Sequence, residues 1–386
     1  MPLAASAPEV ASGLPTEPRR SLDTRLIPRQ YSGDRYDEKL FSATEPGPGR
    51  RLIPTMDPLT HIVAGGAAGQ AVRRWFPGKA IVPFAVLAAW IPDIDNFISA
   101  DPEFYLLHHR GLTHSFAGGL VLAGFLAGIF WAWKRKQGWG FGRLFLFAYA
   151  CVLLHIFLDW INNYGTQVFA PFSDYRAALG SVFIIDPLLT GTLLVLFACS
   201  LKAGLPRKPV FGAAAVGVLL AYPLLNFAIK SSVERTVAAE LEEAGIAHQS
   251  VAASPDAFAP FRWKIIVSAG DQYLMNAYRV FAGDWRPDFQ AHRRPDPAEL
   301  RRLGEEESFF ATWKWFSDYI AVEENTRNGN RRLMFSDLRF ESLHPWARRL
   351  RPDDRPPPFS LEAELDPDGN LLNWQYHGPS IGSRMD

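Results

Sequence analysis

Residues 106–115 read Leu-Leu-His-His-Arg-Gly-Leu-Thr-His-Ser, and a strongly apolar run begins directly after them. Three of the nine histidines of the chain, His108, His109 and His114, lie within this stretch. Imidazole is the commonest protein ligand for transition metals, so a cluster this dense indicates a metal site. The alternative is a polar helix entrance whose histidines only cap backbone groups, and a short cluster alone does not decide between the two.

Apolar runs on both sides of this cluster predict the fold. They cover residues 59–72, 80–98, 116–133, 144–161, 182–201 and 210–229. The third, fourth and sixth are long enough to cross a hydrocarbon core of roughly 30 Å. The first is short and rich in Gly and Ala, which predicts close packing against its neighbours. Because the runs have too few charged faces for a soluble helical core, we expect a mainly α-helical polytopic membrane domain over residues 56–232.

The segments outside these runs have a different composition. Residues 1–55 carry Pro, Ser, Gly, Arg and Glu without apolar periodicity, and we expect a disordered tail, with Met56 as an alternative translation start. Residues 233–386 are typical of a small soluble α+β domain. Its predicted elements are helices at 233–244 and 305–322, a hairpin at 261–281, and strands at 332–340, 359–365 and 371–377.

Charge and cysteine content exclude several classes of protein. The formal net charge is zero and the pI is about 7.1, so no overall positive field favours nucleic acid. Cys151 and Cys199 both lie inside apolar runs, and neither has a CxxC-type partner. A disulfide scaffold and a thiolate zinc site are therefore not expected.

Basic residues predict the orientation in the membrane. Lys and Arg gather between runs one and two, three and four, and five and six, and the positive-inside rule makes these loops cytoplasmic. The remaining run ends and the C-terminal domain would then lie on the outer face of the membrane. Histidines and aspartates of the first four runs all fall at this outer end, although only Lys and Arg were used to orient the chain. They are His61, Asp93, Asp95, His109, His114, His155 and Asp159.

The spacing of these residues favours metal chemistry. His155 and Asp159 are four residues apart on a helix and share one face. Asp93 and Asp95 follow Pro92, and they would point to one side if the backbone were extended there. Nitrogen and oxygen donors without thiolate suit one or two ions of zinc, manganese or iron better than calcium. Asp186, at the start of the fifth run, is a weaker candidate for an outer acceptor.

The ordered set of motifs resembles the YdjM-type family, inner-membrane proteins described as metal-dependent hydrolases, some of them regulated by LexA. The resemblance covers about residues 56–229 and extends loosely to Phe261-Arg-Trp263 and Asp337-Leu-Arg339. It implies that the seven His and Asp residues bind metal. The motifs that carry it are Asp57-Pro-Leu-Thr-His61, Pro92-Asp-Ile-Asp95, His109-Arg-Gly-Leu-Thr-His114-Ser, His155-Ile-Phe-Leu-Asp159 and Asn163-Tyr-Gly-Thr166 followed by Pro171-Phe-Ser173.

We therefore expect a membrane-embedded metal-dependent hydrolase that acts on an ester or phosphoester of a lipid or lipid-linked substrate. Asp93, Asp95 or Asp159 would serve as general base where it is not a ligand, and Arg110 would hold a phosphate or carboxylate. A transporter of protons or metal ions is one alternative, but it requires polar residues through the full membrane depth. A non-catalytic anchor for the C-terminal domain is the other, and it leaves Asp93 and Asp95 without a partner cation.

Overall fold

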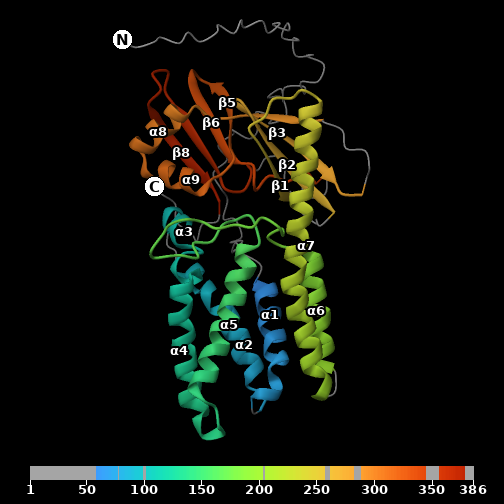
Figure 1. The fold of residues 1–386 in the computed structure, drawn as a ribbon. Helices are drawn as coiled ribbons and strands as arrows, with labels where there is room; N and C mark the ends of the chain where they lie inside the picture. Colours follow the sequence, from blue (N-terminus) through green and yellow to red (C-terminus); the bar gives the residue numbers. More distant parts are fainter. Residues whose placement is uncertain are drawn as a thin grey trace, which may run out of the picture.

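The protein is described by a computed structural model over residues 58–378, apart from 77, 99–100, 203–204, 257–260, 282–287 and 345–355. The predicted tail and the start at Met56 lie outside the described residues. A helical part, α1 to α7, is followed by a part built on two antiparallel sheets, which lies above it in Figure 1. This arrangement confirms the predicted combination of a helical region with a C-terminal part containing antiparallel sheets.

The helical part follows the predicted apolar runs. Within the described residues α4, α5 and α7 are long and apolar enough to cross a membrane, and they correspond to the third, fourth and sixth runs. The helices are α1 (Pro58–Ala71), α2 (Ile81–Trp90), α3 (Pro102–His108), α4 (Phe116–Lys134), α5 (Phe141–Trp160), α6 (Pro187–Lys202) and α7 (Lys208–Glu243). Short 3₁₀ segments connect or extend them: η3 (Arg73–Trp75), η4 (Ile91–Phe97), η5 (Leu112–His114), η6 (Arg135–Gln137) and η7 (Leu205–Arg207).

The Gly/Ala-rich helix α1 packs closely against its neighbours, as its composition predicts. A Cβ atom at Gly65 would lie 2.6 Å from the Cβ of Ala89 on α2, and a Cβ at Gly212 of α7 would lie 2.5 Å from the backbone nitrogen of Ala71. Only glycine permits such approaches between helix backbones. The close packing holds α1 against α2, α6 and α7.

The second apolar run changes geometry near Pro92. The ring of Pro92 lacks an N–H and cannot continue the hydrogen-bond pattern of α2, and the chain continues as the 3₁₀ segment η4. The extended backbone that would point Asp93 and Asp95 to one side is therefore not present. With three residues per turn, these two side chains leave the segment in different directions.

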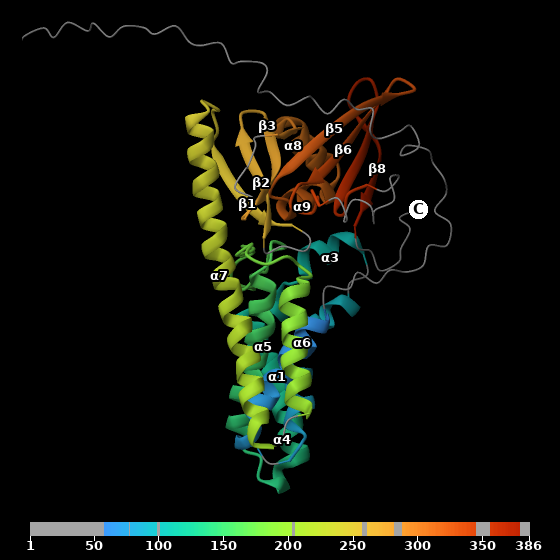
Figure 2. The ribbon, with the colours of Figure 1, turned by 90° about the vertical axis from the view of Figure 1, so that its right-hand side faces the viewer.

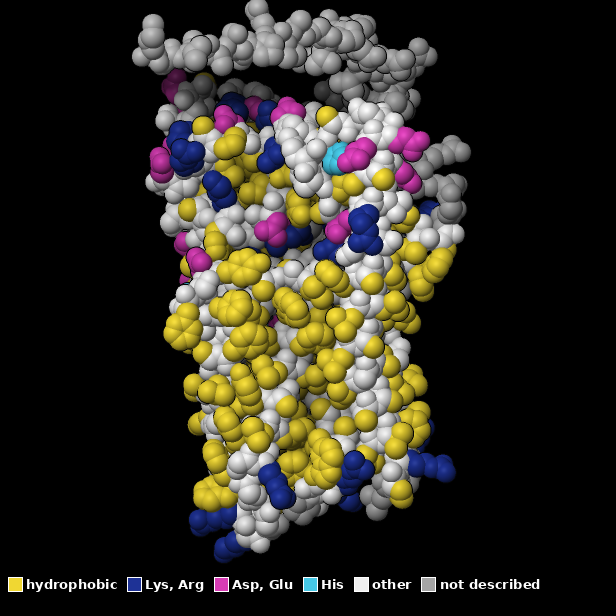
Figure 3. Space-filling model, in the orientation of Figure 1, with side chains coloured by type: hydrophobic (Ala, Val, Ile, Leu, Met, Phe, Trp, Pro, Cys, Tyr) yellow, Lys and Arg dark blue, Asp and Glu magenta, His cyan; other side chains and the backbone are white. Residues whose placement is uncertain are grey.

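The outside of the helical part is strongly apolar. Of α4, only Gly119, Ala123, Leu126 and Ala127 are buried, while Val121 and Phe125 are 71% and 65% exposed. Figure 3 shows a broad hydrophobic band over the helices, with Lys and Arg gathered at the end farthest from the sheets. A contiguous apolar surface of this extent is typical of a lipid-facing protein.

The first sheet has the order β1-β2-β3-β4 and packs on the end of α7. Figure 2 shows α7 running along both the helical part and this sheet. Val233, Val237 and Leu241 of α7 contact Trp263 and neighbouring residues of the sheet. The strands are β1 (Ser250–Pro255), β2 (Arg262–Ala269), β3 (Gln272–Arg279) and β4 (Gln290–Arg293).

The second sheet has the order β5-β6-β7-β8 and is covered by α8 and α9. The aromatic stripe of α9 is buried against it and forms the core of this part: Phe309, Phe310, Trp313 and Phe316. The elements are α8 (Pro297–Glu306), α9 (Ser308–Phe316), β5 (Ile320–Arg327), β6 (Asn330–Asp337), β7 (Ser360–Leu365) and β8 (Leu371–His377).

Two predicted helices of this part are wrong in extent. The helix predicted over 305–322 is α9 together with the last residues of α8, and it ends at Phe316, because Ile320 and Val322 pair with Asp337 and Phe335 in the second sheet. The helix predicted over 233–244 is not separate, since α7 continues without interruption from the apolar run to Glu243.

Candidate metal centre

All seven predicted His and Asp residues lie at the end of the helical part that faces the sheets, and each is buried. His61 is in α1, Asp93 and Asp95 are in η4, His109 follows α3, His114 ends η5, and His155 and Asp159 are in α5.

Two histidines and two carboxylates lie side by side at this end of the helices. The Nε2 atoms of His114 and His155 lie 3.2 Å and 3.3 Å from Oδ2 of Asp159. They also lie 3.5 Å and 3.7 Å from Oδ1 of Asp93. Four ligands arranged tetrahedrally about 2.0 Å from an ion are separated from one another by about 3.3 Å. His114, His155 and Asp159 are therefore spaced as ligands of one ion would be, and Asp93 lies beside both histidines.

Three of these donor atoms also lack another partner. Nε2 of His114, Nε2 of His155 and Oδ2 of Asp159 are buried without a hydrogen bond among the residues that the structure describes. Burying such atoms unpaired costs about 1–3 kcal/mol each, and more for a charged group. A bound cation would remove this cost.

Backbone and side-chain contacts fix the direction of both histidines. Nδ1 of His155 lies 2.7 Å from the carbonyl oxygen of Ala89, which can only accept, so Nδ1 donates and Nε2 presents its lone pair to the centre. Nδ1 of His114 lies 3.3 Å from Oδ2 of Asp95, and Nε2 again faces the centre. Asp93 and Asp95 thus contact opposite nitrogens of His114, although they are only two residues apart.

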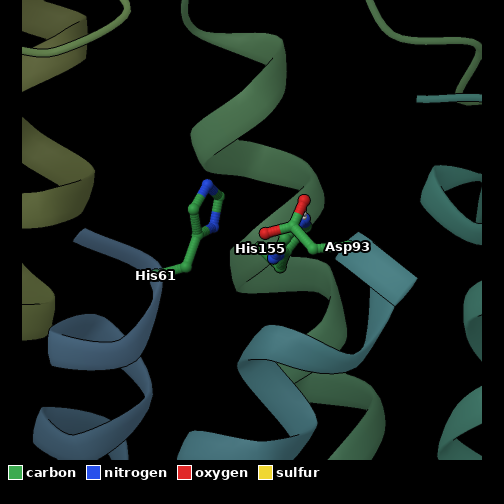
Figure 4. A group of neighbouring side chains, drawn as sticks. All are labelled: His61, Asp93 and His155. Carbon is green, nitrogen blue, oxygen red and sulfur yellow. Dashed lines mark ion pairs between the residues drawn. The ribbon is translucent and has the colours of Figure 1, made fainter. Parts of the chain in front are cut away.

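His61 extends the centre towards α1. Its ring centroid lies 3.9 Å from that of His155, and its Nε2 lies 3.5 Å from Oδ1 of Asp159. Figure 4 shows His61 facing Asp93 and His155 from the neighbouring helix. Six of the seven residues form three overlapping groups whose donor atoms lie within 4.8 Å of one another, and a metal could be held by any of them: His61, Asp93, His155; His114, His155, Asp159; and Asp93, Asp95, His114.

His109 belongs to none of these groups within the described part of the chain. Its Nδ1 lies 3.3 Å from Oδ1 of Asp95, and its ring stacks on Tyr105 at a centroid distance of 4.7 Å. In this geometry His109 positions Asp95, which in turn orients His114.

Arg110 connects two of the carboxylates. Its guanidinium lies 2.7 Å from Oδ1 of Asp159, which leaves Oδ2 directed at the centre, and it donates to Oδ1 of Asn162 at 2.9 Å. Its backbone N–H donates to Oδ2 of Asp95 at 3.1 Å. The φ of Arg110 is +59°, a conformation that non-glycine residues rarely adopt and that is found preferentially at functional sites.

The charges of the centre shift the protonation of Asp95 and His114. Burial alone would raise the pKa of Asp95, but the charge of His114 and the hydrogen bond to His109 outweigh it and hold that pKa well below its usual value. Burial alone would lower the pKa of His114, but Asp95, Asp159 and Asp93 raise it well above its usual value. A cation that binds His114 therefore competes with a proton.

Asp186, a candidate outer acceptor for the centre, is instead engaged by α6 and α7. It caps α6 by accepting from the backbone N–H groups of Leu188 and Leu189 at 2.9 Å and 3.0 Å, and it accepts from the hydroxyl of Tyr222 at 2.9 Å. These contacts account for its burial.

The C-terminal part forms the roof of the centre, a contribution that sequence reasoning did not predict. Arg339 is buried, and its guanidinium donates to the carbonyl oxygen of Asn163 at 3.3 Å. The side-chain nitrogen of Asn163 donates to Oγ of Ser254 at 2.9 Å. The next residue, Tyr164, lies beneath the guanidinium of Arg110, 4.7 Å from the ring centroid. The motif Asp337-Leu-Arg339 was the one signal of this contact in the sequence.

Comparison with known proteins agrees with the sequence motifs. Residues 56–233 match the model of the family described as YdjM inner membrane protein. The chain is 28% identical over 299 residues to the uncharacterized protein YfhP of Bacillus subtilis (strain 168), covering 74% of this chain and 88% of that protein. No solved structure matches the chain significantly. Residues 56–233 are therefore similar to the YdjM inner membrane protein family, over somewhat less than half of the chain.

Proposed function

We propose that this protein is a membrane-embedded, metal-dependent hydrolase. The observation that carries the proposal is the convergence of His114, His155, Asp159 and Asp93, three of them through buried atoms with no hydrogen bond in the described chain. These three atoms face one another at 3.2–3.3 Å without meeting hydrogen-bond geometry, an arrangement that suits ligands of a shared cation.

The ligand set favours zinc or manganese. Nitrogen and carboxylate donors without thiolate suit these ions, and the overlapping groups around Asp93 and His155 offer room for one ion or two. When bound, a divalent ion supplies Lewis acidity that polarises an ester or phosphoester and lowers the pKa of water.

The residues around the centre would bind the substrate, position the ligands and accept a proton. Arg110 presents a guanidinium beside the centre and orients an anionic oxygen of the substrate. Asp95 is engaged by His109, His114 and the backbone of Arg110, so it positions ligands. Asp159 divides its oxygens between Arg110 and the centre. Asp93 contacts the centre through Oδ1, and its other oxygen is the best candidate for a general base.

The membrane placement follows from the apolar band and the charges. The inner-membrane family and the band around α4, α5 and α7 support a multi-pass protein of the inner membrane. The basic end would lie in the cytoplasm, and the centre and the sheets on the outer face. A centre at this boundary would meet ester and phosphoester groups of lipids or lipid-linked molecules.

The side chains on the cytoplasm-facing side of the centre favour a hydrolase over a transporter. The described side chains between α1, α2 and α5 are mainly apolar, including Ala67, Ala85, Ala88, Ala148 and Val152. An ion path through the bundle would require polar groups at this depth.

Hydrolysis by the purified protein in detergent tests the proposal. The metal is stripped and restored with zinc or manganese, and release of nitrophenol from nitrophenyl phosphate and carboxylate esters and of headgroup from a phospholipid is followed. We expect activity only with restored metal and a loss of at least roughly 100-fold in His155→Ala. The matched control His248→Ala, outside the centre, should keep its activity. Activity unaffected by metal removal would contradict the proposal.

A further inference from the structure

We infer that a phospholipid reaches the centre sideways from the membrane, between the starts of α1 and α6. Its phosphoryl group would lie against Arg110 while its acyl chains remain in the bilayer. This inference rests on the proposed function, because it names the substrate class and the entry route of the same centre.

A small cavity of about 20 Å³ lies beside the centre, and it would have to widen to admit a phosphoryl group. It lies between α1, the end of α5, the segment before α6, and the start of α6. Its polar lining includes Thr60, His61, Arg110, Asp159, Asn162 and Thr190. Nδ1 of His61 is buried there without a hydrogen bond in the described chain.

The lining suits a phosphoryl group. Arg110 supplies a guanidinium, whose fork of N–H donors matches phosphate oxygens, and His61, Asn162 and the threonines add further donors. Of the two carboxylates at the cavity, Asp159 is paired with Arg110, and both oxygens of Asp186 accept hydrogen bonds from α6 and Tyr222, which directs them away from the centre.

Entry from above is closed by the roof. Asn163 and Tyr164 are buried beneath Arg339, and Arg339 is itself only 6% exposed. The side between α1 and α6 is different. Leu59, Ile185 and Leu188, which neighbour the cavity residues in sequence, are 48%, 50% and 47% exposed. Such exposed apolar side chains suit contact with lipid chains.

The proposed route is confined to the end of the bundle. Farther along α1, a Cβ at Gly66 would lie 2.6 Å from Cζ of Phe197 on α6, so the helices are in close contact there. At the cavity itself the hydroxyl oxygens of Thr60 and Thr190 lie 2.6 Å apart and join the two helices. This hydrogen bond is a small latch across the route, and a lipid would have to part it.

Photocrosslinking in vesicles tests the route without depending on activity. Phe183, which lines the cavity, is replaced as Phe183→p-benzoylphenylalanine, and the lipid-facing Phe125 of α4 receives the same change as control. The vesicles contain phosphatidylglycerol and a diacylglycerol with the same acyl chains, and mass spectrometry identifies the attached lipid. We expect the ratio of phospholipid to diacylglycerol in the adduct at 183 to be about tenfold higher than in the vesicles. One hydrogen bond to a charged group contributes about this factor in affinity. The adduct at 125 should match the vesicle composition.

A reversible lock tests the latch in the same assay. Thr60→Cys/Thr190→Cys in a Cys199→Ser chain places two sulfurs where the hydroxyls are 2.6 Å apart, close to the roughly 2.05 Å of a disulfide. Oxidation should remove most of the adduct at 183, reduction should restore it, and position 125 should not respond. Thr190→Trp fills the opening by bulk and should have the same effect as oxidation.

The outcomes separate this inference from the proposed function. Equal adduct composition at 183 and 125, or an adduct at 183 that survives both the disulfide and Thr190→Trp, would overturn the route. Capture of phospholipid at 183 by a protein that hydrolyses nothing would support the route and contradict the hydrolase. Hydrolysis of vesicle phospholipid that continues when the Thr60→Cys/Thr190→Cys disulfide is formed would support the hydrolase and contradict the route.

Discussion

Replacing Arg339 with Met should destabilise the C-terminal part and loosen the roof of the centre. Arg339 is 6% exposed, and its Nε and Nη2 atoms lie 2.8 Å and 2.6 Å from Oδ2 of Asp337, which is fully buried. Its Nη1 lies 2.7 Å from Oδ2 of Asp318 and donates to the carbonyl oxygen of Asn163. The substitution leaves the carboxylate of Asp337 buried without its counter-charge.

The cost follows from that burial. Removing one partner of a buried ion pair costs about 3–5 kcal/mol of the free energy of unfolding. For a part of this size, 1 kcal/mol corresponds to about 2–4 °C, so the melting temperature should fall by roughly 6–20 °C. An Arg339→Met/Asp337→Asn variant should recover part of the loss, because the uncompensated charge is removed.

Tryptophan fluorescence during heating measures this change, since Trp263 and Trp313 are fully buried in the sheet part. The control is Arg293→Met, because Arg293 is half exposed in its ion pair with Glu324 and should contribute less than about 1 kcal/mol. A melting temperature of Arg339→Met equal to that of the control would refute the reasoning.

Two further predictions concern the membrane part. Reporter fusions at Gly138 and after Asp386 should report opposite sides of the membrane, because basic residues gather at the end of the bundle away from the sheets, and reports from the same side would refute the orientation. Gly66→Leu should lower the yield of folded protein and cost roughly 1–3 kcal/mol or more through its clash with Phe197, whereas Gly128→Leu, where a side chain meets open space, should fold normally; equal yields would contradict the packing of α1 on α6.

The helical part was predictable because its signals are local. Uniform apolar runs gave α4 and α5 closely, and Pro92 marked the end of α2. The convergence of His155, Asp159 and Asp93 could be predicted from charge orientation alone, because all three lie at one end of their helices.

The features that escaped prediction depend on contacts distant in sequence. The roof of the centre joins Asn163 to Arg339, and the motif at 337–339 did not indicate which residue Arg339 would contact. The place of His109 beside Asp95 follows from the turn at Arg110, whose positive φ is not visible from residue type. The helix predicted to continue past Phe316 failed because strand pairing with β6 overrides local helical periodicity.

Metal content is the most direct test of the central claim. Purified protein is exposed to zinc or manganese, washed, and analysed for bound metal per chain by mass spectrometry of the elements. Wild-type protein should retain one or two ions, and His114→Ala/His155→Ala should retain none, because these residues present their unpaired Nε2 atoms to the centre. His109→Ala, which changes a residue that only positions Asp95, should still bind metal, more weakly by about 10–100-fold. Equal metal content in wild-type protein and in His114→Ala/His155→Ala would contradict the account.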